Sequence, residues 1–340
     1  MISTTPPQAM RLAVAAAEGV RGTTNPNPPV GAVILDAVGS IAGVGATQPP
    51  GGPHAEVVAL QAAGDRARGG TAVVTLEPCN HHGRTPPCTE ALVAAGVTAV
   101  YYAVPDPNPA AAGGAAALAQ AGIEVDAGLL ADEVERGPLR AWLHKQRFGR
   151  PHVTWKLAAS LDGRSAAADG TSQWITGPQA RARVHAERAK LDAIVVGTGT
   201  VLYDDPRLTA RLPSGEPAHR QPLRVVVGHS ELPPNSRVLD DAAPTRLIRT
   251  RDPHQVIAEL SEYTDILIEG GPRLAGAFLS AGLVDHIIAY YAPILLGDGA
   301  AAVSNAGVGN IAQALRFRRE YVETIGPDVL ISLVPEQTKE

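Results

Sequence analysis

Short apolar segments alternate with helical ones along the first half of the chain, and this alternation constrains the fold more than any other feature. The apolar segments that we predict to be strands are 30–36, 41–46, 71–76, 99–104 and 123–127. The Ala- and Leu-rich stretches that we predict to be helices are 8–20, 54–63, 88–95, 115–121 and 132–148. Short strands alternating with helices indicate a layered α/β sheet.

The sequence Gly149-Arg150-Pro151 marks the domain boundary that we predict, because a proline disfavours helix at the residue before it. After it the pattern restarts, with predicted strands at 153–159, 193–197, 223–227, 245–248, 265–269 and 286–295 and helices at 179–189 and 273–281. A length of 340 residues suits two domains. We place them at 1–148 and 149–340, and no internal repeat relates the two halves.

The charge balance argues against a nucleic-acid-binding protein. The chain has 29 Lys and Arg against 34 Asp and Glu, which gives a net charge of −5, whereas a DNA or RNA binder needs a basic surface to neutralise phosphates. The first seven residues lack the basic segment and apolar run of a signal peptide. The apolar run 287–296 is about half the roughly 20 residues of a membrane-spanning helix. We therefore expect a cytoplasmic protein that binds neither nucleic acid nor membrane.

The cysteines point to a metal. Cys79 and Cys88 are the only two in the chain, and His54 precedes them in a Pro-His-Ala-Glu segment. Imidazole and thiolate suit zinc, and three protein ligands leave a fourth position for a reactive water. Glu56, two residues after His54, is placed to shuttle protons. The alternatives are a structural zinc site completed by a histidine of the 80–87 loop, and two buried cysteines without metal.

A known motif has this residue order. His-x-Glu followed by Pro-Cys-x-x-Cys is the signature of zinc nucleobase deaminases, although here eight residues separate the cysteines. The stretch 75–88, Thr-Leu-Glu-Pro-Cys-Asn-His-His-Gly-Arg-Thr-Pro-Pro-Cys, resembles the deaminase half of the bifunctional riboflavin-biosynthesis deaminase–reductases, which have this long loop. The stretch 25–31, Asn-Pro-Asn-Pro-Pro-Val-Gly, is similar to that family's first substrate loop.

The resemblance implies roles for individual residues. It implies that the zinc ligands are His54, Cys79 and Cys88 and that the catalytic proton shuttle is Glu56. It also implies substrate contacts at Asn27, His81 and Arg84, although a loop arginine such as Arg84 can simply be solvated. The family commonly has a histidine shortly before its Pro-His-Ala-Glu, where this chain has Ala-Thr-Gln. Thr47 is the candidate replacement at that position.

The second half holds no Gly-x-Gly-x-x-Gly after a strand. Gly270-Gly271-Pro272 follows a predicted strand and opens a predicted helix, so its free N–H groups can bind phosphate, unless it is a plain tight turn. Residues 197–200, Gly-Thr-Gly-Thr, follow another strand and are predicted to form a ligand-facing turn. Asp204-Asp205-Pro206 is predicted to start a turn.

Four segments of this half, 156–163, 172–176, 204–211 and 269–272, occur in the order seen in the same family's reductase half, which is similar to dihydrofolate reductase and uses NADPH. The resemblance covers about residues 8–333. It implies an NADPH site lined by Ala159, Trp174, Thr200, Asp204, Gly271, Pro272, Arg273, Leu274, Ala275, Gly276 and Ala277. It implies a substrate site lined by Lys156, Ser172, Arg188, Leu208, Arg211 and Glu269.

The resemblance therefore implies an α/β fold with a cytidine-deaminase-like three-layer N-terminal domain and a dihydrofolate-reductase-like C-terminal domain. The implied activity is zinc-dependent deamination of a diaminopyrimidinone ribosylamino phosphate, then NADPH-dependent reduction of its ribosyl group to ribityl. We expect the cofactors to be one zinc ion per chain and NADPH, and the substrate to be a small phosphorylated pyrimidine. We expect the protein to form a homo-oligomer, namely a dimer. The alternatives are a nucleoside or base deaminase with a nucleotide-binding regulatory domain, and a zinc-stabilised binding module without activity.

Overall fold

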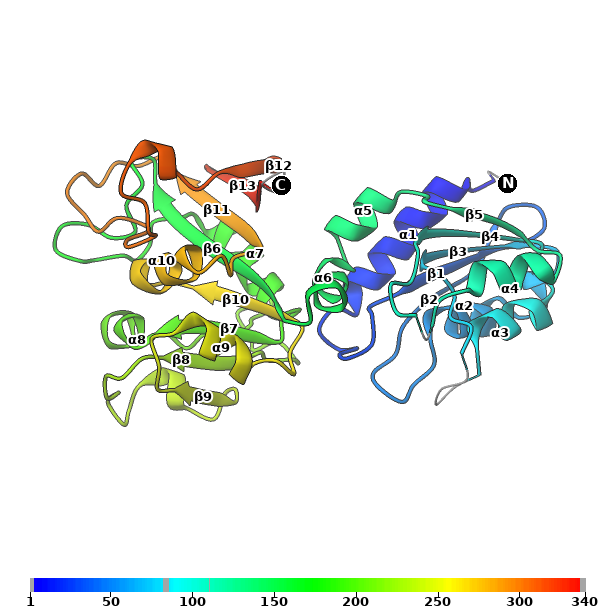
Figure 1. Ribbon diagram of the computed structural model, residues 1–340, viewed down its shortest axis with the longest axis horizontal. Coiled ribbons are helices and arrows are strands. Elements are labelled where there is room, and N and C mark those ends of the chain that lie inside the picture. Colours follow the sequence, from blue (N-terminus) through cyan, green and yellow to red (C-terminus); the bar gives the residue numbers. More distant parts are fainter. Residues whose placement is uncertain (1–2, 82–85, 110, 337–340) are drawn as a thin grey trace. The chain divides into compact units, whose positions relative to one another are not determined.

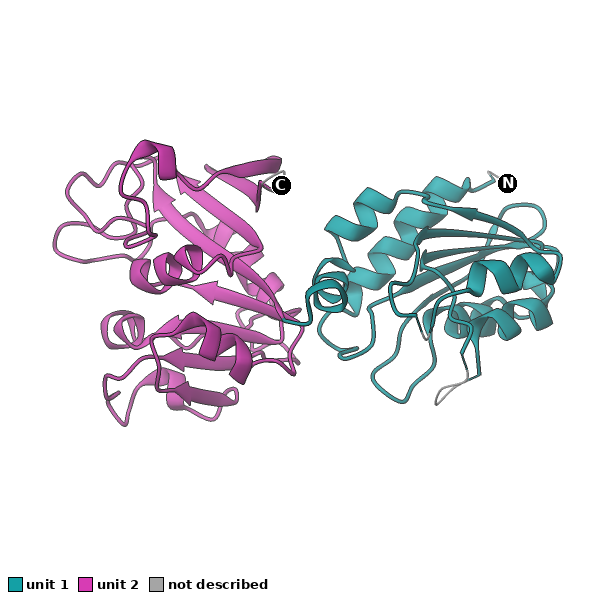
Figure 2. Cartoon of the chain, in the orientation of Figure 1, with its two compact units in different colours: residues 1–150 teal, residues 151–340 magenta. Residues whose placement is uncertain are grey.

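The computed structural model describes residues 3–81, 86–109 and 111–336. The chain forms two compact units, Met1–Arg150 and Pro151–Glu340 (Figure 2). Each unit has its own sheet and its own hydrophobic core. No helix among the described residues is long and apolar enough to span a lipid bilayer.

The first unit is built on a five-stranded sheet of order β2-β1-β3-β4-β5, in which β1 is antiparallel to β2 and β3 and the last three strands are parallel. Figure 1 shows α1 and α5 on one face of this sheet and α2, α3 and α4 on the other. The strands are β1 (Gly31–Leu35), β2 (Ile41–Ala46), β3 (Thr71–Leu76), β4 (Ala99–Val104) and β5 (Glu124–Ala127). The helices are α1 (Pro6–Gly19), α2 (Ala55–Ala63), the 3-10 turn η1 (Gly64–Ala67), α3 (Cys88–Ala95), α4 (Gly114–Gln120), α5 (Ala131–Arg136) and α6 (Arg140–Phe148).

Close packing of α2 on β2 fixes the start of α2. A β-carbon built on Gly45 would lie 2.3 Å from the carbonyl oxygen of Ala55, and one on Gly43 would lie 2.2 Å from that of Ala59. Glycine therefore lets the backbone of α2 rest directly on the strand. Because α2 begins at Ala55, this contact places His54 and Glu56 near the carboxyl ends of β2 and β3, since Gly45 pairs with Ala32 and Ala32 pairs with Val74.

The second unit has an eight-stranded sheet of order β12-β13-β11-β6-β10-β7-β8-β9. The six strands from β11 to β9 are parallel, and β12 and β13 form an antiparallel hairpin on β11. The strands are β6 (His152–Ser160), β7 (Ala193–Gly197), β8 (Leu223–Val227), β9 (Thr245–Ile248), β10 (Asp265–Glu269), β11 (His286–Ala292), β12 (Phe317–Ile325) and β13 (Asp328–Pro335). The helices are α7 (Pro178–Arg188), α8 (Thr198–Asp204), α9 (Pro253–Glu259), α10 (Pro272–Ser280) and the 3-10 turns η2 (Arg237–Leu239) and η3 (Ile311–Gln313).

Both faces of this sheet are covered, so its central strands are apolar at nearly every position. Ile266 and Ile268 of β10 pack in the core that includes α9 and α10, whereas Leu267 packs on the opposite face with Val201 of α8. By the same alternation Glu269 lies on the α7 and α8 face, opposite Lys156 of β6 in the strand register. The sheet thus carries polar side chains at the carboxyl end of β10 and in the middle of β6.

Three predicted elements need correction. The single helix over 132–148 is wrong: α5 and α6 are separate helices because Pro138 has no N–H to donate and its ring clashes with the carbonyl of the preceding turn. The predicted turn at 197–200 is wrong as well, because Gly197 caps helix α8. The predicted strand 286–295 ends at Ala292, directly before Pro293.

Candidate active sites

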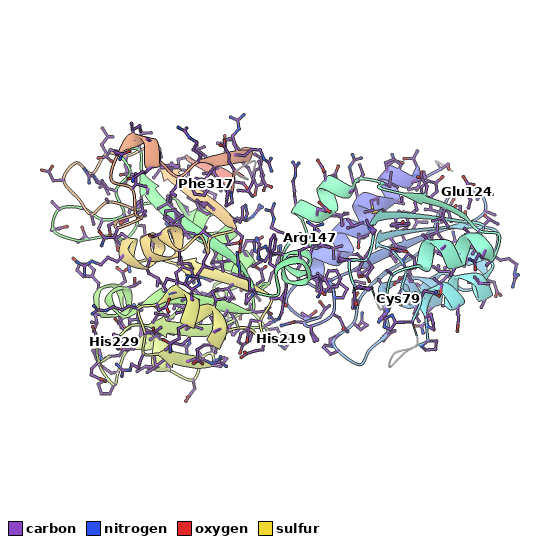
Figure 3. All side chains as sticks on the ribbon, viewed as in Figure 1. Cys79, Glu124, Arg147, His219, His229 and Phe317 are labelled. Carbon is purple, nitrogen blue, oxygen red and sulfur yellow. The ribbon has the colours of Figure 1, made fainter. Side chains whose placement is uncertain are left out.

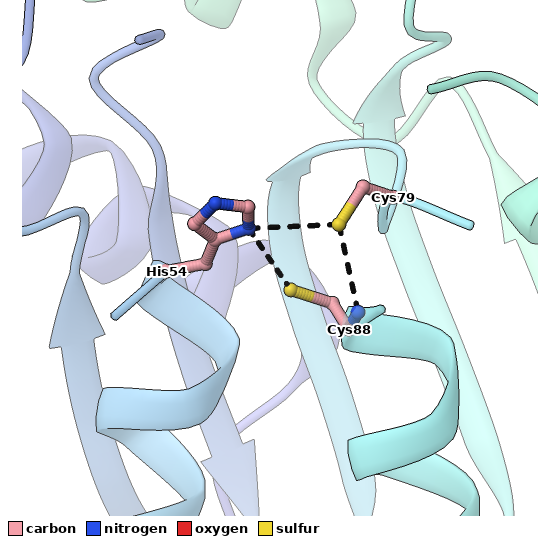
Figure 4. A group of neighbouring side chains, drawn as sticks. All are labelled: His54, Cys79 and Cys88. Carbon is pink, nitrogen blue, oxygen red and sulfur yellow. Dashed lines mark hydrogen bonds between the residues drawn. The ribbon is translucent and has the colours of Figure 1, made fainter. Parts of the chain in front are cut away.

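Three side chains of the first unit meet at one point. His54 precedes α2, Cys79 follows β3, and Cys88 is the first residue of α3 (Figures 3 and 4). Nδ1 of His54 lies 3.5 Å from Sγ of Cys79 and 3.3 Å from Sγ of Cys88. One ligand atom from each residue lies within 4.8 Å of the others. One imidazole nitrogen and two thiol sulfurs converging in this way are a donor set that fits zinc.

The environment favours the thiolate at Cys79. A hydrogen bond from the Cys88 side chain, reinforced by His54, lowers the pKa of Cys79 to about 4, and the backbone N–H of Cys88 also donates to its sulfur at 3.5 Å. The shared hydrogen bond and burial raise the pKa of Cys88. The hydrogen bond to Cys79 also raises the pKa of His54. The thiolate is the form that binds metal.

Glu56 lies in the first turn of α2 and its side chain is buried, with 4% of the residue exposed. Burial raises the pKa of this carboxyl group to about 7, and the charge on Cys79 acts in the same direction. A carboxyl group that titrates near neutral pH can both accept a proton and return it.

The predicted substrate residues of the first unit differ in what the structure shows of them. Asn27 lies in a closed turn, since the hydroxyl of Thr24 donates to its carbonyl at 2.9 Å. Nδ1 of His81 is buried and has no hydrogen-bond partner among the described residues, so it is available to a ligand. Arg84 lies outside the described residues. The hydroxyl of Thr47 accepts from the N–H of Val30 at 3.1 Å and so holds the 25–31 segment.

Two residues without a role in the predicted site hold the chain around Cys79. Glu77 is buried and accepts from the N–H groups of Asp106 at 3.2 Å and Ala115 at 3.0 Å. The amide oxygen of Asn80 accepts from the hydroxyl of Thr89 at 2.9 Å. The only signal for either residue was its place beside Cys79.

The second unit gathers three of the predicted substrate residues. Glu269 accepts from Nε of Arg188 at 3.0 Å and from its Nη2, and Lys156 stands opposite Glu269 in the strand register. Burial alone would raise the pKa of Glu269, but the charges of Arg188 and Lys156 outweigh burial and lower it to about 2. Burial lowers the pKa of Lys156. The cluster therefore presents an ionised carboxylate that is paired with Arg188 and has Lys156 as its neighbour in the strand register.

The 204–211 segment connects to this cluster. The hydroxyl of Ser172 donates to Asp204 at 2.8 Å, and Nη1 of Arg188 donates to the carbonyl of Thr209 at 3.1 Å. Leu208 has a φ of +52° and its side chain is buried in the core on the α8 face, which leaves only its backbone for a ligand. Arg211 makes a long contact of 3.5 Å to the carbonyl of Gly215.

The glycine turn before α10 has the features of a phosphate cradle. Gly270 and Gly271 have φ values of +90° and +72°, which disfavour other residues, and Gly271 caps the helix. A β-carbon on Gly271 would lie 3.2 Å from the hydroxyl oxygen of Thr200, so this turn lies against the first turn of α8. The free N–H groups at the start of α10 fit the phosphates of a dinucleotide.

The other residues predicted to line the NADPH site are divided between surface and core. Trp174 is 69% exposed, with the guanidinium of Arg181 4.6 Å from its ring centre. Arg273 is exposed, and Pro272, Leu274 and Ala277 are half-buried. The side chains that face the protein interior are those of Ala159 and Ala275, and Gly276 packs against the backbone of Ser304. Residues of this second set can meet a ligand only through their backbone.

Comparison with known proteins shows the family. The model of the cytidine and deoxycytidylate deaminase zinc-binding region matches residues 3–104, and that of the RibD C-terminal domain matches residues 151–331, more than half of the chain. The riboflavin biosynthesis protein RibD of Mycobacterium tuberculosis H37Rv is 59% identical over 327 residues, which cover 96% of each chain. The chain belongs to the RibD family.

Other RibD proteins agree along the whole chain. The Escherichia coli K12 protein is 42% identical over 361 residues, covering 96% of this chain and 98% of its own. The solved structure of Acinetobacter baumannii RibD superposes with a TM-score of 0.83 at 39% identity, covering 98% and 99% of the two chains. A Thermotoga maritima structure, a diaminohydroxyphosphoribosylaminopyrimidine deaminase/5-amino-6-(5-phosphoribosylamino)uracil reductase, gives 0.87 at 32%, covering 97% and 98%.

The RibD family membership confirms the predicted fold class and the predicted activity. The chain is a bifunctional riboflavin-biosynthesis enzyme that combines a deaminase domain of the zinc-binding cytidine-deaminase type with a reductase domain. The match over 151–331 excludes a purely regulatory second domain.

Proposed function

We propose that this chain hydrolytically deaminates a diaminopyrimidinone ribosylamino phosphate and then reduces its ribosyl group to ribityl with NADPH. The two activities named for the Thermotoga maritima relative support this pair of substrates. The observation that carries the proposal is the convergence of His54, Cys79 and Cys88 beside the buried Glu56. We assign the first reaction to residues 1–148 and the second to residues 149–340.

We propose that His54, Cys79 and Cys88 hold one zinc ion per chain. When bound, zinc lowers the pKa of water and makes it a nucleophile at neutral pH. Glu56 would take one proton from the attacking water and pass it to a ring nitrogen, and would then carry the water's second proton to the departing amine, so that the water oxygen bonds to the ring carbon and ammonia leaves. Nδ1 of His81 and Asn27 would orient the pyrimidine, and Arg84 would contact the substrate's phosphate.

We propose that the second unit holds the sugar phosphate beside NADPH. Lys156 and Glu269 would orient the opened sugar, Ser172 and the backbone of Leu208 would line the same pocket, and Arg188 and Arg211 would bind the phosphate. NADPH would be held by Thr200, Asp204, Trp174 and residues 271–277, and when bound it supplies the hydride. The protein's contribution is to hold the two reactants in contact.

The same proposal covers partners and location. The net charge of −5 supports a small phosphorylated substrate in preference to nucleic acid, and we propose a cytoplasmic homodimer that does not bind membranes. Light scattering of the purified protein would test the dimer, and a mass of one chain would contradict it.

A two-part assay on one purified sample tests the proposed function. The ribosylamino pyrimidine phosphate is added first and ammonia is measured, and the deaminated pyrimidine is then added with NADPH and its oxidation is followed. The proposal predicts both signals. Ammonia release without NADPH oxidation would overturn the reductase assignment, and NADPH oxidation without ammonia release would overturn the deaminase assignment.

A further inference from the structure

Arg224 is the second residue of β8, and its side chain has no exposed surface. A buried guanidinium is costly unless its donors are paired. Its Nε donates to the hydroxyl of Thr245 at 2.9 Å, and its Nη1 donates to Asp240 at 2.8 Å and to the carbonyl of Arg207 at 3.3 Å. Further donors reach the carbonyls of Arg237, Asp240 and Ala243.

These bonds connect segments that are distant in sequence. Arg207 belongs to the loop after α8, the 237–243 segment contains η2, and Thr245 begins β9. A single charged group in one central strand thus holds two loops and an edge strand.

A second arginine, Arg237, bonds the same loop at Asp205, two residues before Arg207. The backbone N–H of Arg237 donates to the carboxylate of Asp205 at 2.7 Å, and its Nε donates to the carbonyl of Asp205 at 2.7 Å. Asp205 has a φ of +38°, where the chain turns out of α8. Arg237 and Arg224 therefore fix the loop at Asp205 and at Arg207.

The loop fixed in this way leads into the proposed substrate site. Leu208 packs against Val238 in the core on the α8 face, and the carbonyl of Thr209 accepts from Arg188. Arg211 follows two residues later. A shift of the loop at Arg207 would move the Thr209 carbonyl away from Arg188 and would also move Arg211. Loss of Arg224 or Arg237 would cause such a shift without touching either residue, because among the described residues these two arginines bond the loop only at Arg207 and Asp205.

We propose that Arg224 and Arg237 are positioning residues of the reductase, which hold the 205–211 segment so that Leu208, Thr209 and Arg211 meet the sugar phosphate. This inference rests on the proposed substrate site. Arg224 acts only through other residues, because its buried guanidinium cannot reach a ligand.

The test compares four variants of the full chain in the reductase assay with pre-deaminated substrate. Arg224→Lys keeps the charge but cannot reach all the carbonyls, and Arg237→Ala removes the half-exposed side chain at little risk to folding. Leu260→Ala is the matched control. Leu260 lies in the core on the α9 face, so this substitution lowers the stability of the unit without changing a contact of the loop. Arg211→Ala reports on the substrate site itself.

We expect Arg224→Lys and Arg237→Ala to raise the KM for the pyrimidine substrate about tenfold, because a small misplacement of a binding group weakens binding strongly. The KM for NADPH and the rate of ammonia release stay unchanged, and Leu260→Ala changes neither KM. A fall in kcat alone, with both KM values unchanged in the two clamp variants, would overturn the inference. If Arg211→Ala also leaves the substrate KM unchanged, the proposed substrate site is wrong and the inference fails with it.

Discussion

At the scale of single residues, Glu56 offers the sharpest separation of metal binding from proton transfer. Glu56→Gln keeps the size of the side chain and leaves His54, Cys79 and Cys88 in place, so zinc content stays at the wild-type level. Ammonia release falls about 10²- to 10⁴-fold, because the amide cannot carry the proton. Zinc analysis and an ammonia assay on the same sample check this. A variant that keeps wild-type ammonia release would remove Glu56 from the mechanism.

Glu269 gives a prediction about pH. Its pKa of about 2 lies below the ordinary value of 4.5, so its ion pairs stabilise the fold above about pH 4.5 and that stabilisation is lost as the pH falls towards 2. Glu269→Gln leaves the guanidinium of Arg188 without its carboxylate partner and lowers the free energy of unfolding by about 3–5 kcal/mol at pH 7.

The difference in stability between wild type and Glu269→Gln is measured by urea unfolding from pH 7 to pH 2.5. It shrinks as the pH falls below about 4.5, because the carboxylate of the unfolded chain becomes protonated there while that of the folded chain, with a pKa of about 2, stays ionised. A difference that stays constant over this range would show that Glu269 does not act through its charge.

The residues that the sequence could reveal were those whose chemical type is rare. Two cysteines and a neighbouring histidine stand out in any chain, and the structure brings them together. The burial of Ala275 and Gly276 was not predictable, since which face of a short helix turns inwards depends on the sheet beneath it. The bonding role of Arg224 could not be predicted either, because its partners come from segments that are distant in sequence.

At the scale of elements, the contact of α2 with β2 controls the deaminase site. Gly45→Ala would place a methyl group 2.3 Å from the carbonyl oxygen of Ala55, and because this atom is backbone, α2 must shift. We expect a loss of about 1–3 kcal/mol of stability together with reduced zinc affinity. Thermal unfolding and zinc titration measure the two effects.

Gly19→Ala is the matched control for this substitution. Gly19 ends α1 and a β-carbon there meets nothing within 4 Å, so alanine is neutral or slightly stabilising. Equal losses of stability in both glycine variants would contradict the packing argument for α2.

The sequence predicted the helices α2 and α3 correctly, as well as parallel strands such as β3 and β7, whose buried positions form continuous apolar runs. The hairpin of β12 and β13 was missed because β12 is an edge strand that carries exposed charged residues such as Arg318 and Arg319. Helix α9 was also missed, although Asp252 caps it by accepting from the N–H of His254 at 2.9 Å, followed by Pro253 at the first helical position. That capping signal was present in the sequence.

At the scale of the whole molecule, the two units have separate cores, and the residues proposed for each reaction lie within one unit. Loss of a metal ligand in the first unit should therefore leave the second unit folded and active. We therefore claim that one chain holds two catalysts that act independently.

Zinc content and both activities, measured together on wild type and Cys79→Ser, test that claim most directly. The account predicts one zinc ion and both activities in the wild type. It predicts that Cys79→Ser has no zinc, no ammonia release and an unchanged rate of NADPH oxidation with pre-deaminated substrate. Retained zinc and ammonia release in Cys79→Ser, or loss of its NADPH oxidation, would contradict the account.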